Sequence, residues 1–322
     1  MREITIGKNE ANQRIDKFLR KYMPKASMGF IYKMIRKKNI KLNNQRTPQD
    51  YILKEEDQIQ LYLSEDTIKG FLEEKTIYNV KRNFDIVYED ENLILVNKPQ
   101  GLLVHEDHKE QENTLVNQVI KYLYDQGEYN PKEEKTFVPA SVNRLDRNTS
   151  GIVIIAKNYE TLQNLNEMVR KKEYIRKYYL TIVKGQIKNG EELKGYLIKD
   201  TNSNCVKLVS NETEKAKFIY TKYKPIKTSN QYSLLEVEII TGRTHQIRLH
   251  LSSRSHPIVG DDKYGDEKVN KIFKDKFKLK YQFLHAYKIT FHKCIGNLKY
   301  LEGKNFTARL SSNFENIKEQ LF

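Results

Sequence analysis

The chain has 322 residues, with 57 Lys and Arg against 42 Asp and Glu, and a formal net charge of +15. This length allows a full hydrophobic core and suggests two domains, while the positive charge points to a polyanionic partner, nucleic acid before an anionic membrane. The longest clean apolar runs, such as "IVIIA", are far shorter than the ~20 residues of a membrane span. Two distant cysteines, Cys205 and Cys294, argue against a disulfide framework, so we expect a soluble cytoplasmic protein.

The segment "NQRIDKFLRKYM" predicts a helix whose apolar face consists of Ile15, Phe18, Leu19, Tyr22 and Met23. Asn12 is the expected N-cap, and Pro24 ends the helix. Ser27 can cap a second helix, "FIYKMIRKKN", in which Ile31, Met34 and Ile35 face inward. Its solvent side is basic and carries Lys33, Arg36, Lys37 and Lys38. Two strands, "IKLNN" and "DQIQLYL", are expected to follow, the first ending in an Asn-Asn turn.

Residues 1–63 carry fourteen Lys and Arg against seven Asp and Glu, about half of the excess positive charge. Two short helices followed by strands, with a basic second helix, resemble the RNA-binding domain named for ribosomal small-subunit protein four. The resemblance implies that Lys33, Arg36, Lys37 and Lys38 bind RNA; the alternative is an amphipathic helical pair with a solubilising surface. Residues 64–82 lack a clear period, and we expect a linker there.

From residue 84 onward strand-like runs outnumber helical ones. They are "FDIVYEDENLILVNK", "IVIIA", "YYLTIV", "FIYTKY", "SLLEVEII" and "YKITFH". Helical spacing appears in "TLVNQVIKYL" and "YETLQNLNEMV". This irregular mixture favours an α+β fold with a mixed, largely antiparallel central sheet and flanking helices over residues 83–322. Thr149-Ser150-Gly151 fits no P-loop or Rossmann spacing, and we interpret Gly151 as a turn before a strand.

The stretch "VNRLDRNTSGIVIIAKN", residues 142–158, places Asp146 between Arg144 and Arg147. Such a carboxylate is most often part of a solvated surface ion pair. Here it belongs to "NRLDRNTSGIVIIAK", which closely resembles the catalytic signature of the RluA-type pseudouridine synthases of the ribosomal large subunit. Three further segments resemble that family's motifs in the same order: "VNKPQGLLVH" (96–105), "RKYYLTIVKG" (176–185) and "TGRTHQIRLHLSSRSHPIVGDDKYG" (241–265).

The resemblance implies a cofactor-free isomerisation of uridine within RNA, most plausibly large-subunit ribosomal RNA. Asp146 would be the nucleophile, and a carboxylate suits this step because glycosidic cleavage develops positive charge on the sugar. Tyr179 would lie against the uracil and assist proton transfer, and Arg248 would pair with Asp146 and keep it ionised and aimed. Without the motif, the tyrosine would be a core residue and the arginine a helix-surface cation bound to phosphate.

Arginine and lysine side chains near these motifs are expected to contact the RNA. Arg144 would brace the strand where the target base is flipped out, with a plain phosphate contact as the alternative. The other expected substrate-binding residues are Arg147, Lys177, Lys98 and Arg243. His105 and His108 could suggest a metal site, but no matching ligand cluster completes it, so we expect no metal. We expect a monomer.

Two positions depart from the family signature. Asn143 stands where the signature has histidine, and Asn148 where aspartate is common. The first leaves open how the loop is hydrogen-bonded, and it favours one alternative, a non-catalytic RNA-binding or ribosome-assembly protein. A nucleobase glycosylase or nuclease is the other alternative, and it would release a base or cut the chain.

Overall fold

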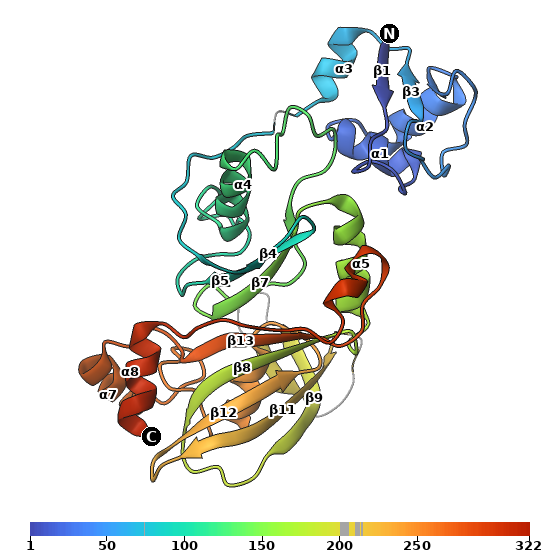
Figure 1. The fold of residues 1–322 in the computed structure, drawn as a ribbon. Helices are drawn as coiled ribbons and strands as arrows, with labels where there is room; N and C mark the ends of the chain where they lie inside the picture. Colours follow the sequence, from blue (N-terminus) through green and yellow to red (C-terminus); the bar gives the residue numbers. More distant parts are fainter. Residues whose placement is uncertain (74, 200–205, 210–212, 214) are drawn as a thin grey trace.

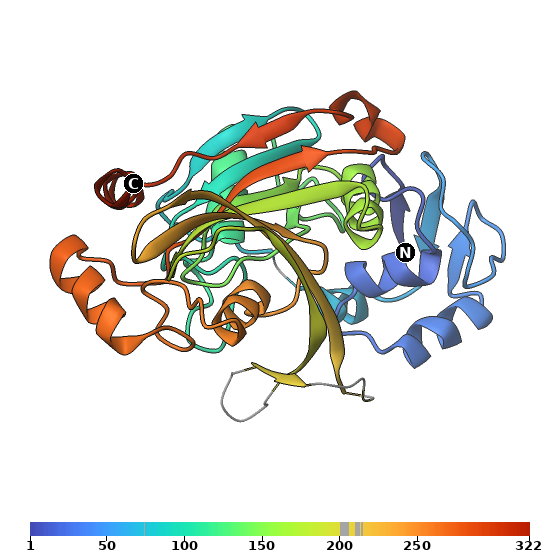
Figure 2. The same cartoon turned by 90° about the horizontal axis from the view of Figure 1, so that it is seen from below.

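The computed structural model describes residues 1–73, 75–199, 206–209, 213 and 215–322. Residues 2–72, here called the N-terminal unit, lie at one end of the molecule (Figure 1). The rest of the chain is built around one large sheet, which is seen from a second direction in Figure 2. The N-terminal unit and the sheet have separate hydrophobic clusters.

The N-terminal unit combines a small sheet with helices. The antiparallel sheet has the order β1-β3-β2, from β1 (Arg2–Thr5), β2 (Ile40–Leu42) and β3 (Gln58–Leu61). Helices α1 (Ile15–Tyr22) and α2 (Met28–Arg36) bury the predicted apolar faces, and Ser27 caps α2 by accepting from Phe30 N. The Asn12 cap is wrong, because its backbone is left-handed at φ 60° and donates to Leu53 O, and α1 begins only after Arg14.

The expected linker over residues 64–82 is wrong at its start. Residues Glu65–Phe71 form helix α3, capped by Ser64, whose oxygen accepts from Thr67 N. Ile68 is fully buried in the hydrophobic cluster of the N-terminal unit, so this helix packs on α1 and α2 instead of connecting two parts. A helix of seven residues with one fully buried side chain is too short to show a clear helical period in the sequence.

The main sheet has eleven strands and a central order of β10-β9-β11-β12-β8-β13-β7-β5-β4. Among the strands of the described residues, only β13 and β7 pair in parallel, which confirms the mixed, largely antiparallel sheet. The strands are β4 (Asp85–Glu89), β5 (Leu93–Lys98), β6 (Ala140–Ser141), β7 (Ser150–Ala156), β8 (Ile175–Lys184), β9 (Glu191–Lys199), β10 (Val206–Val209), β11 (Lys217–Thr228), β12 (Tyr232–Ile239), β13 (Leu284–Phe291) and β14 (Asn305–Thr307).

Helices cover both faces of this sheet. Helix α4 (Leu115–Asp125) and α6 (Gln246–Ser253) share one hydrophobic cluster, while α5 (Tyr159–Arg170) and the 3₁₀ helix Gly296–Leu301 share another on the opposite face. Helices α7 (Glu267–Phe277) and α8 (Ser312–Leu321) contribute to one hydrophobic cluster at the end of the molecule that holds the C-terminus (Figure 1). The sequence did not predict α6, α7, α8, β9 or β10.

Strand β7 lies in the interior of the sheet and is buried on both faces. Val153 and Ile155 pack toward α4, and Ile152 and Ile154 toward α5, which explains the uninterrupted apolar run. Gly151 lies inside this strand and is not a turn before it, so that prediction is wrong. Its φ is 114°, and a Cβ there would lie 2.3 Å from Ala286 O of β13, so only glycine allows the two backbones to approach this closely.

Polar contacts join the N-terminal unit to the main sheet. Asn9 donates to Glu134 Oε1 at 2.7 Å and accepts from Tyr159 N at 3.1 Å. Just after the unit, Lys75 donates to Glu134 O and Phe137 O. Among the described residues, no helix is long and apolar enough to cross a bilayer, and no group of His, Cys, Asp and Glu is arranged to hold a metal ion.

Candidate active site

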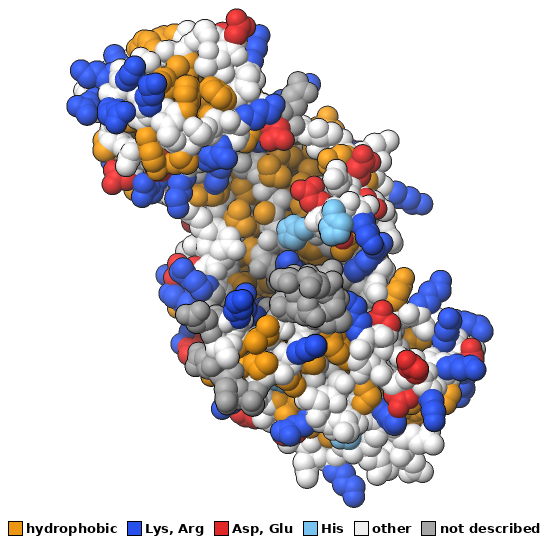
Figure 3. Space-filling model, turned by 180° about the vertical axis from the view of Figure 1, so that it is seen from behind, with side chains coloured by type: hydrophobic (Ala, Val, Ile, Leu, Met, Phe, Trp, Pro, Cys, Tyr) orange, Lys and Arg blue, Asp and Glu red, His pale blue; other side chains and the backbone are white. Residues whose placement is uncertain are grey.

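A cavity of about 790 Å³ opens between the loop before β7, strand β8 and the segment that leads into α6. Its wall includes side chains of β9 and β10 at one edge of the sheet. Six of the predicted site residues line it, namely Asp146, Tyr179, Arg248, Arg144, Lys177 and Arg243. Figure 3 shows Lys and Arg side chains around the hollowed face of the molecule and on the N-terminal unit. The cavity therefore joins motifs that are about one hundred residues apart in the sequence.

The two arginines beside Asp146 point to different places. Arg144 is exposed and lines the cavity, whereas Arg147 lies outside the cavity lining and donates from Nε to Gly101 O at 3.0 Å. Between them, the buried Leu145 anchors the loop, and Thr149 N donates to Asp146 O at 3.0 Å. The Asp146 side chain is 27% exposed and faces the cavity. The Arg147 side chain ties the loop to the bend at Gly101.

Arg248 is buried beside Asp146. Its Nη1 lies 3.5 Å from Asp146 Oδ2, while Nε and Nη2 each donate to Asp261 at 2.7 Å. Burial acts to lower the pKa of Arg248, but the hydrogen bonds and charge of Asp261 outweigh it and raise that pKa. The guanidinium is thus a fixed cation with one nitrogen directed at Asp146. With a side chain that is 4% exposed, it is not a helix-surface cation.

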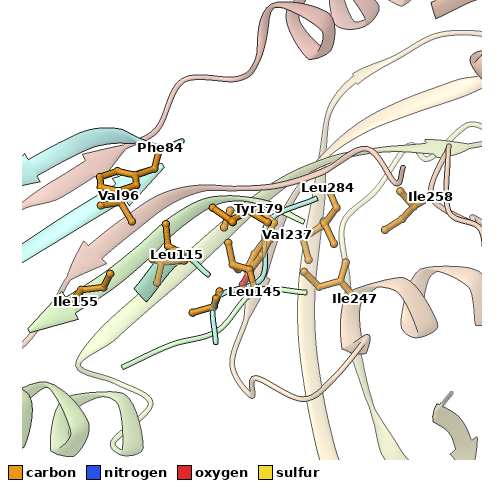
Figure 4. Close-up of a cluster of buried hydrophobic side chains, with 14 of the residues drawn as sticks. Phe84, Val96, Leu115, Leu145, Ile155, Tyr179, Val237, Ile247, Ile258 and Leu284 are labelled. Carbon is orange, nitrogen blue, oxygen red and sulfur yellow. The ribbon is translucent and has the colours of Figure 1, made fainter. Parts of the chain in front are cut away.

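Tyr179 and Lys177 lie on one face of β8, because side chains two apart on a strand point the same way. Tyr179 is 6% exposed and packs with Leu145, Val237 and Leu284 (Figure 4). Burial, with the nearby charge of Asp146, raises the pKa of the Tyr179 phenol, so it stays protonated. Burial lowers the pKa of Lys177. Within the described part of the chain, the Tyr179 hydroxyl has no hydrogen-bond partner.

Lys98 does not reach the cavity, and its prediction as a substrate contact is wrong. The side chain is fully buried, and Nζ donates to Pro99 O and Leu102 O at 2.8 Å and to Arg147 O at 3.0 Å. Burial lowers the pKa of Lys98 to about 7, although the charge of Asp146 opposes this shift. Three carbonyl acceptors match the three donors of an ammonium group, so Lys98 joins the 98–102 bend to the Asp146 loop.

Asn143 replaces the histidine of the signature without leaving the loop unanchored. Its Nδ2 donates to Ile152 O at 3.2 Å, and its Oδ1 accepts from Ile154 N at 2.8 Å. Both bonds are made to the backbone of β7. The loop that carries Asp146 is therefore fixed to the central strand by an amide side chain.

Comparison with known proteins follows the same motifs. Residues 92–253 match a family model described as RNA pseudouridylate synthase. An uncharacterized RNA pseudouridine synthase of Mycoplasma capricolum is 34% identical over 308 residues, which cover 94% of this chain and 96% of the relative. The chain belongs to the RNA pseudouridine synthase family. The synthase is also 31% identical over 327 residues to the ribosomal large subunit pseudouridine synthase C of Haemophilus influenzae, covering 99% of this chain and 94% of the relative.

The synthase shares its fold with solved structures. The structure of human RNA pseudouridylate synthase domain containing 4 has a TM-score of 0.57 and 22% identity, covering 74% of this chain and 92% of the human chain. Human RNA pseudouridylate synthase domain containing 1 has a TM-score of 0.52 and 19% identity, covering 78% and 97%. These neighbours confirm the expected pseudouridine synthase fold, and the family makes the chain an isomerase that acts on RNA.

Two residues of the site were not predicted individually. Asp261, which holds Arg248, is 1% exposed and follows the buried Ile258 and Val259. His245 lies just before α6, and its Nε2 is 3.8 Å from Asp146 Oδ2. Both belong to the fourth motif of the synthase, residues 241–265. The sequence pattern shows neither the buried ion pair of Asp261 with Arg248 nor the approach of His245 to a carboxylate 99 positions earlier.

Proposed function

We propose that this synthase converts specific uridines to pseudouridine in large-subunit ribosomal RNA, with Asp146 as the nucleophile and without a cofactor. The observation that carries this proposal is the position of Asp146 in a cavity, 3.5 Å from the buried cation Arg248. The choice of RNA is supported by relatives named ribosomal large subunit pseudouridine synthase C from several bacteria.

The reaction requires a group that accepts developing positive charge. Cleavage of the bond between the uracil nitrogen and the ribose leaves the sugar electron-poor, and a carboxylate can stabilise it or bond to it. Arg248 holds Asp146 in a fixed direction, because the arginine is itself held at two points by Asp261. The base then turns, C5 of uracil is joined to the sugar, and the hydrogen on C5 leaves.

Tyr179 and Lys177 act on the base side of the cavity. A phenol that stays protonated in a buried wall suits contact with the uracil face and a hydrogen bond to it. The burial that lowers the pKa of Lys177 brings its amine closer to a proton-accepting state. These two groups are the candidates for handling the proton that leaves C5.

Arg144 and Arg243 contact the RNA at the cavity entrance. Both side chains are exposed and line the cavity. A uracil within a helix must be extruded to reach Asp146, and a planar guanidinium can brace the vacated position or bind a phosphate. Arg147 also remains a candidate for phosphate contact through the part of its exposed side chain that does not hold Gly101.

The N-terminal unit provides a second RNA contact. Helix α2 and the two residues after it present four exposed cations: Lys33, Arg36, Lys37 and Lys38. We assign to this unit, residues 1–72, the RNA-binding role of domains like that of ribosomal small-subunit protein four. The catalytic part then comprises residues 83–322, and the protein acts in the cytoplasm as a monomer.

The decisive experiment maps pseudouridine across ribosomal RNA in cells with and without this protein, then complements with wild type or Asp146→Asn. Loss of defined sites, restored only by wild type, establishes both reaction and substrate. If the deletion strain keeps every pseudouridine in its ribosomal RNA and in its transfer RNA, the proposal is contradicted and a non-catalytic RNA-binding protein is favoured. Released uracil or cleaved RNA with purified protein would instead indicate a glycosylase or nuclease.

A further inference from the structure

A chain of contacts leads from Asp146 to the edge of the main sheet. His245 Nε2 lies 3.8 Å from Asp146 Oδ2, and Nδ1 of the same ring lies 3.0 Å from the Tyr264 hydroxyl. That hydroxyl accepts from Val206 N of β10 at 3.1 Å. His245 has left-handed backbone at φ 54°, and its side chain makes no capping bond to α6. The ring is therefore oriented by its two neighbours, one at each nitrogen.

The contacts of Tyr264 indicate which nitrogen of His245 carries the proton. Its hydroxyl oxygen receives the Val206 N–H and lies 3.0 Å from His245 Nδ1 and 3.5 Å from Val206 O, so the shorter contact favours donation of the hydroxyl hydrogen to the ring. An imidazole that accepts at Nδ1 carries its hydrogen at Nε2. The nitrogen facing Asp146 is then a donor.

The charge of Asp146 leads to the same tautomer. A carboxylate oxygen 3.8 Å away repels a bare nitrogen lone pair and attracts an N–H group. Burial lowers the pKa of His245, against the opposing charge of Asp146, which agrees with a neutral ring. Arg248 Nη1 also makes its closest approach to Oδ2 of Asp146, so two donors converge on the same oxygen.

We propose that His245 is a positioning residue for the synthase reaction, which donates from Nε2 to Asp146 while the Tyr264 hydroxyl fixes this tautomer. The distance of 3.8 Å is longer than a hydrogen bond. Such contacts in unliganded sites are often long and tighten when substrate binds. The proposal rests on the function proposed above, because it assigns His245 a task only where Asp146 is the reacting group.

Two substitutions of His245 separate this task from simple packing. The amide nitrogen of glutamine can reach the position of Nε2, whereas that of asparagine reaches only the position of Nδ1. We expect H245N to slow single-turnover isomerisation about ten- to one-hundredfold, the loss typical of one hydrogen bond to a charged group. We expect H245Q to lose less than about threefold, which corresponds to under half of the free energy of a tenfold change.

The assay follows tritium release from large-subunit ribosomal RNA transcribed with uridine tritiated at C5, using the full chain. Y264F keeps the aromatic ring but removes the hydroxyl, so it should slow release and shift its pH profile with unchanged RNA affinity. Equal rates for H245Q and H245N, or a wild-type rate and pH profile for Y264F, would overturn the proposal. Wild type that releases no tritium from any RNA would instead refute the proposed function itself.

Discussion

Both carboxylate oxygens of Asp261 accept hydrogen bonds from Arg248, at 2.7 Å each, and the same arginine lies next to Asp146, the candidate nucleophile. Because Nε and Nη2 of Arg248 donate to Asp261, its third nitrogen, Nη1, is directed toward Asp146. The carboxylate of Asp262 also approaches Arg248, at 3.3 Å, but its side chain is 67% exposed. The two neighbouring aspartates therefore form a matched pair of sites, one buried and one solvated.

Replacing Asp261 by Asn should impair both stability and catalysis. The variant leaves the buried cation Arg248 without its charged partner, which lowers the free energy of unfolding by about 3 kcal/mol. It also no longer holds the guanidinium of Arg248 in the direction of Asp146. We expect tritium release to fall about a hundredfold, as expected for misplaced reacting groups. Asp262→Asn is the control and should behave like wild type in urea unfolding and in activity. Equal losses in both variants would show that the buried pair has no special role.

Tyr179→Phe should remove chemistry while sparing the fold. The hydroxyl has no hydrogen-bond partner among the described residues, so its loss leaves no buried group unsatisfied. We expect the single-turnover rate to fall about a hundredfold or more, as for other positioned proton-transfer groups, with unchanged RNA affinity by filter binding. A phenylalanine variant that isomerises at the wild-type rate would restrict Tyr179 to packing.

Two buried histidines should make the protein sensitive to acid. His285 accepts or donates at Ser150 Oγ, 2.8 Å away, and burial lowers the pKa values of His285 and His250 to about 4. Between pH 6.5 and 4 the unfolded chain binds protons at these residues that the folded chain does not. Stability is therefore fully present above pH 6.5 and is lost as the pH falls, by up to roughly 1.4 kcal/mol per pH unit for each histidine.

The measurement is urea unfolding at pH 7, 6 and 5 for wild type and His285→Asn. Asparagine can keep a hydrogen bond to Ser150 but does not titrate, so the variant should lose part of the pH dependence between pH 6 and pH 5. The same slope in both proteins would mean that His285 stays unprotonated in the unfolded chain as well, or that it titrates normally when folded.

The cations of helix α2 and of the two residues after it should account for part of the salt dependence of RNA binding. Changing Lys33, Arg36, Lys37 and Lys38 to Gln should weaken binding. It should also reduce the slope of log affinity against log salt by up to about three, since each phosphate contact contributes roughly 0.7–0.9. The control removes the same charge from exposed lysines of α7: Lys268, Lys271, Lys274 and Lys276. If the α7 variant loses more RNA affinity and more of the salt slope than the variant at residues 33–38, the RNA contact lies at the α7 end of the molecule instead.

The sequence predicted what depends on local pattern and on motifs. The apolar run of β7, the faces of α1 and α2, and the residues that meet in the cavity all follow from spacing or from family signatures. The prediction that Lys98 contacts substrate was wrong because a motif does not show which way a side chain points. Its ammonium group points inward and donates to three backbone carbonyls. Gly151 failed because its partner, Ala286, lies 135 residues later.

Partners distant in the chain also explain the missed helix and site residues. Ile68 belongs to a helix only because the cluster around α1 and α2 offers it a place to pack. Asp261 and His245 acquire meaning from Arg248 and Asp146, which the fold brings to them. Sequence alone identifies such residues as members of a motif and leaves their contacts open.

The close approach at Gly151 fixes one wall of the cavity more firmly than the other. The Asp146 loop leads directly into β7, which pairs with β5 on one side and β13 on the other and is packed on both faces. The opposite half includes β10, an edge strand of four residues. We therefore expect substitutions in the Asp146 loop to impair the reaction, and substitutions in β9 and β10 to alter RNA recognition. The sheet edge is then the place to attempt retargeting of this enzyme to another uridine.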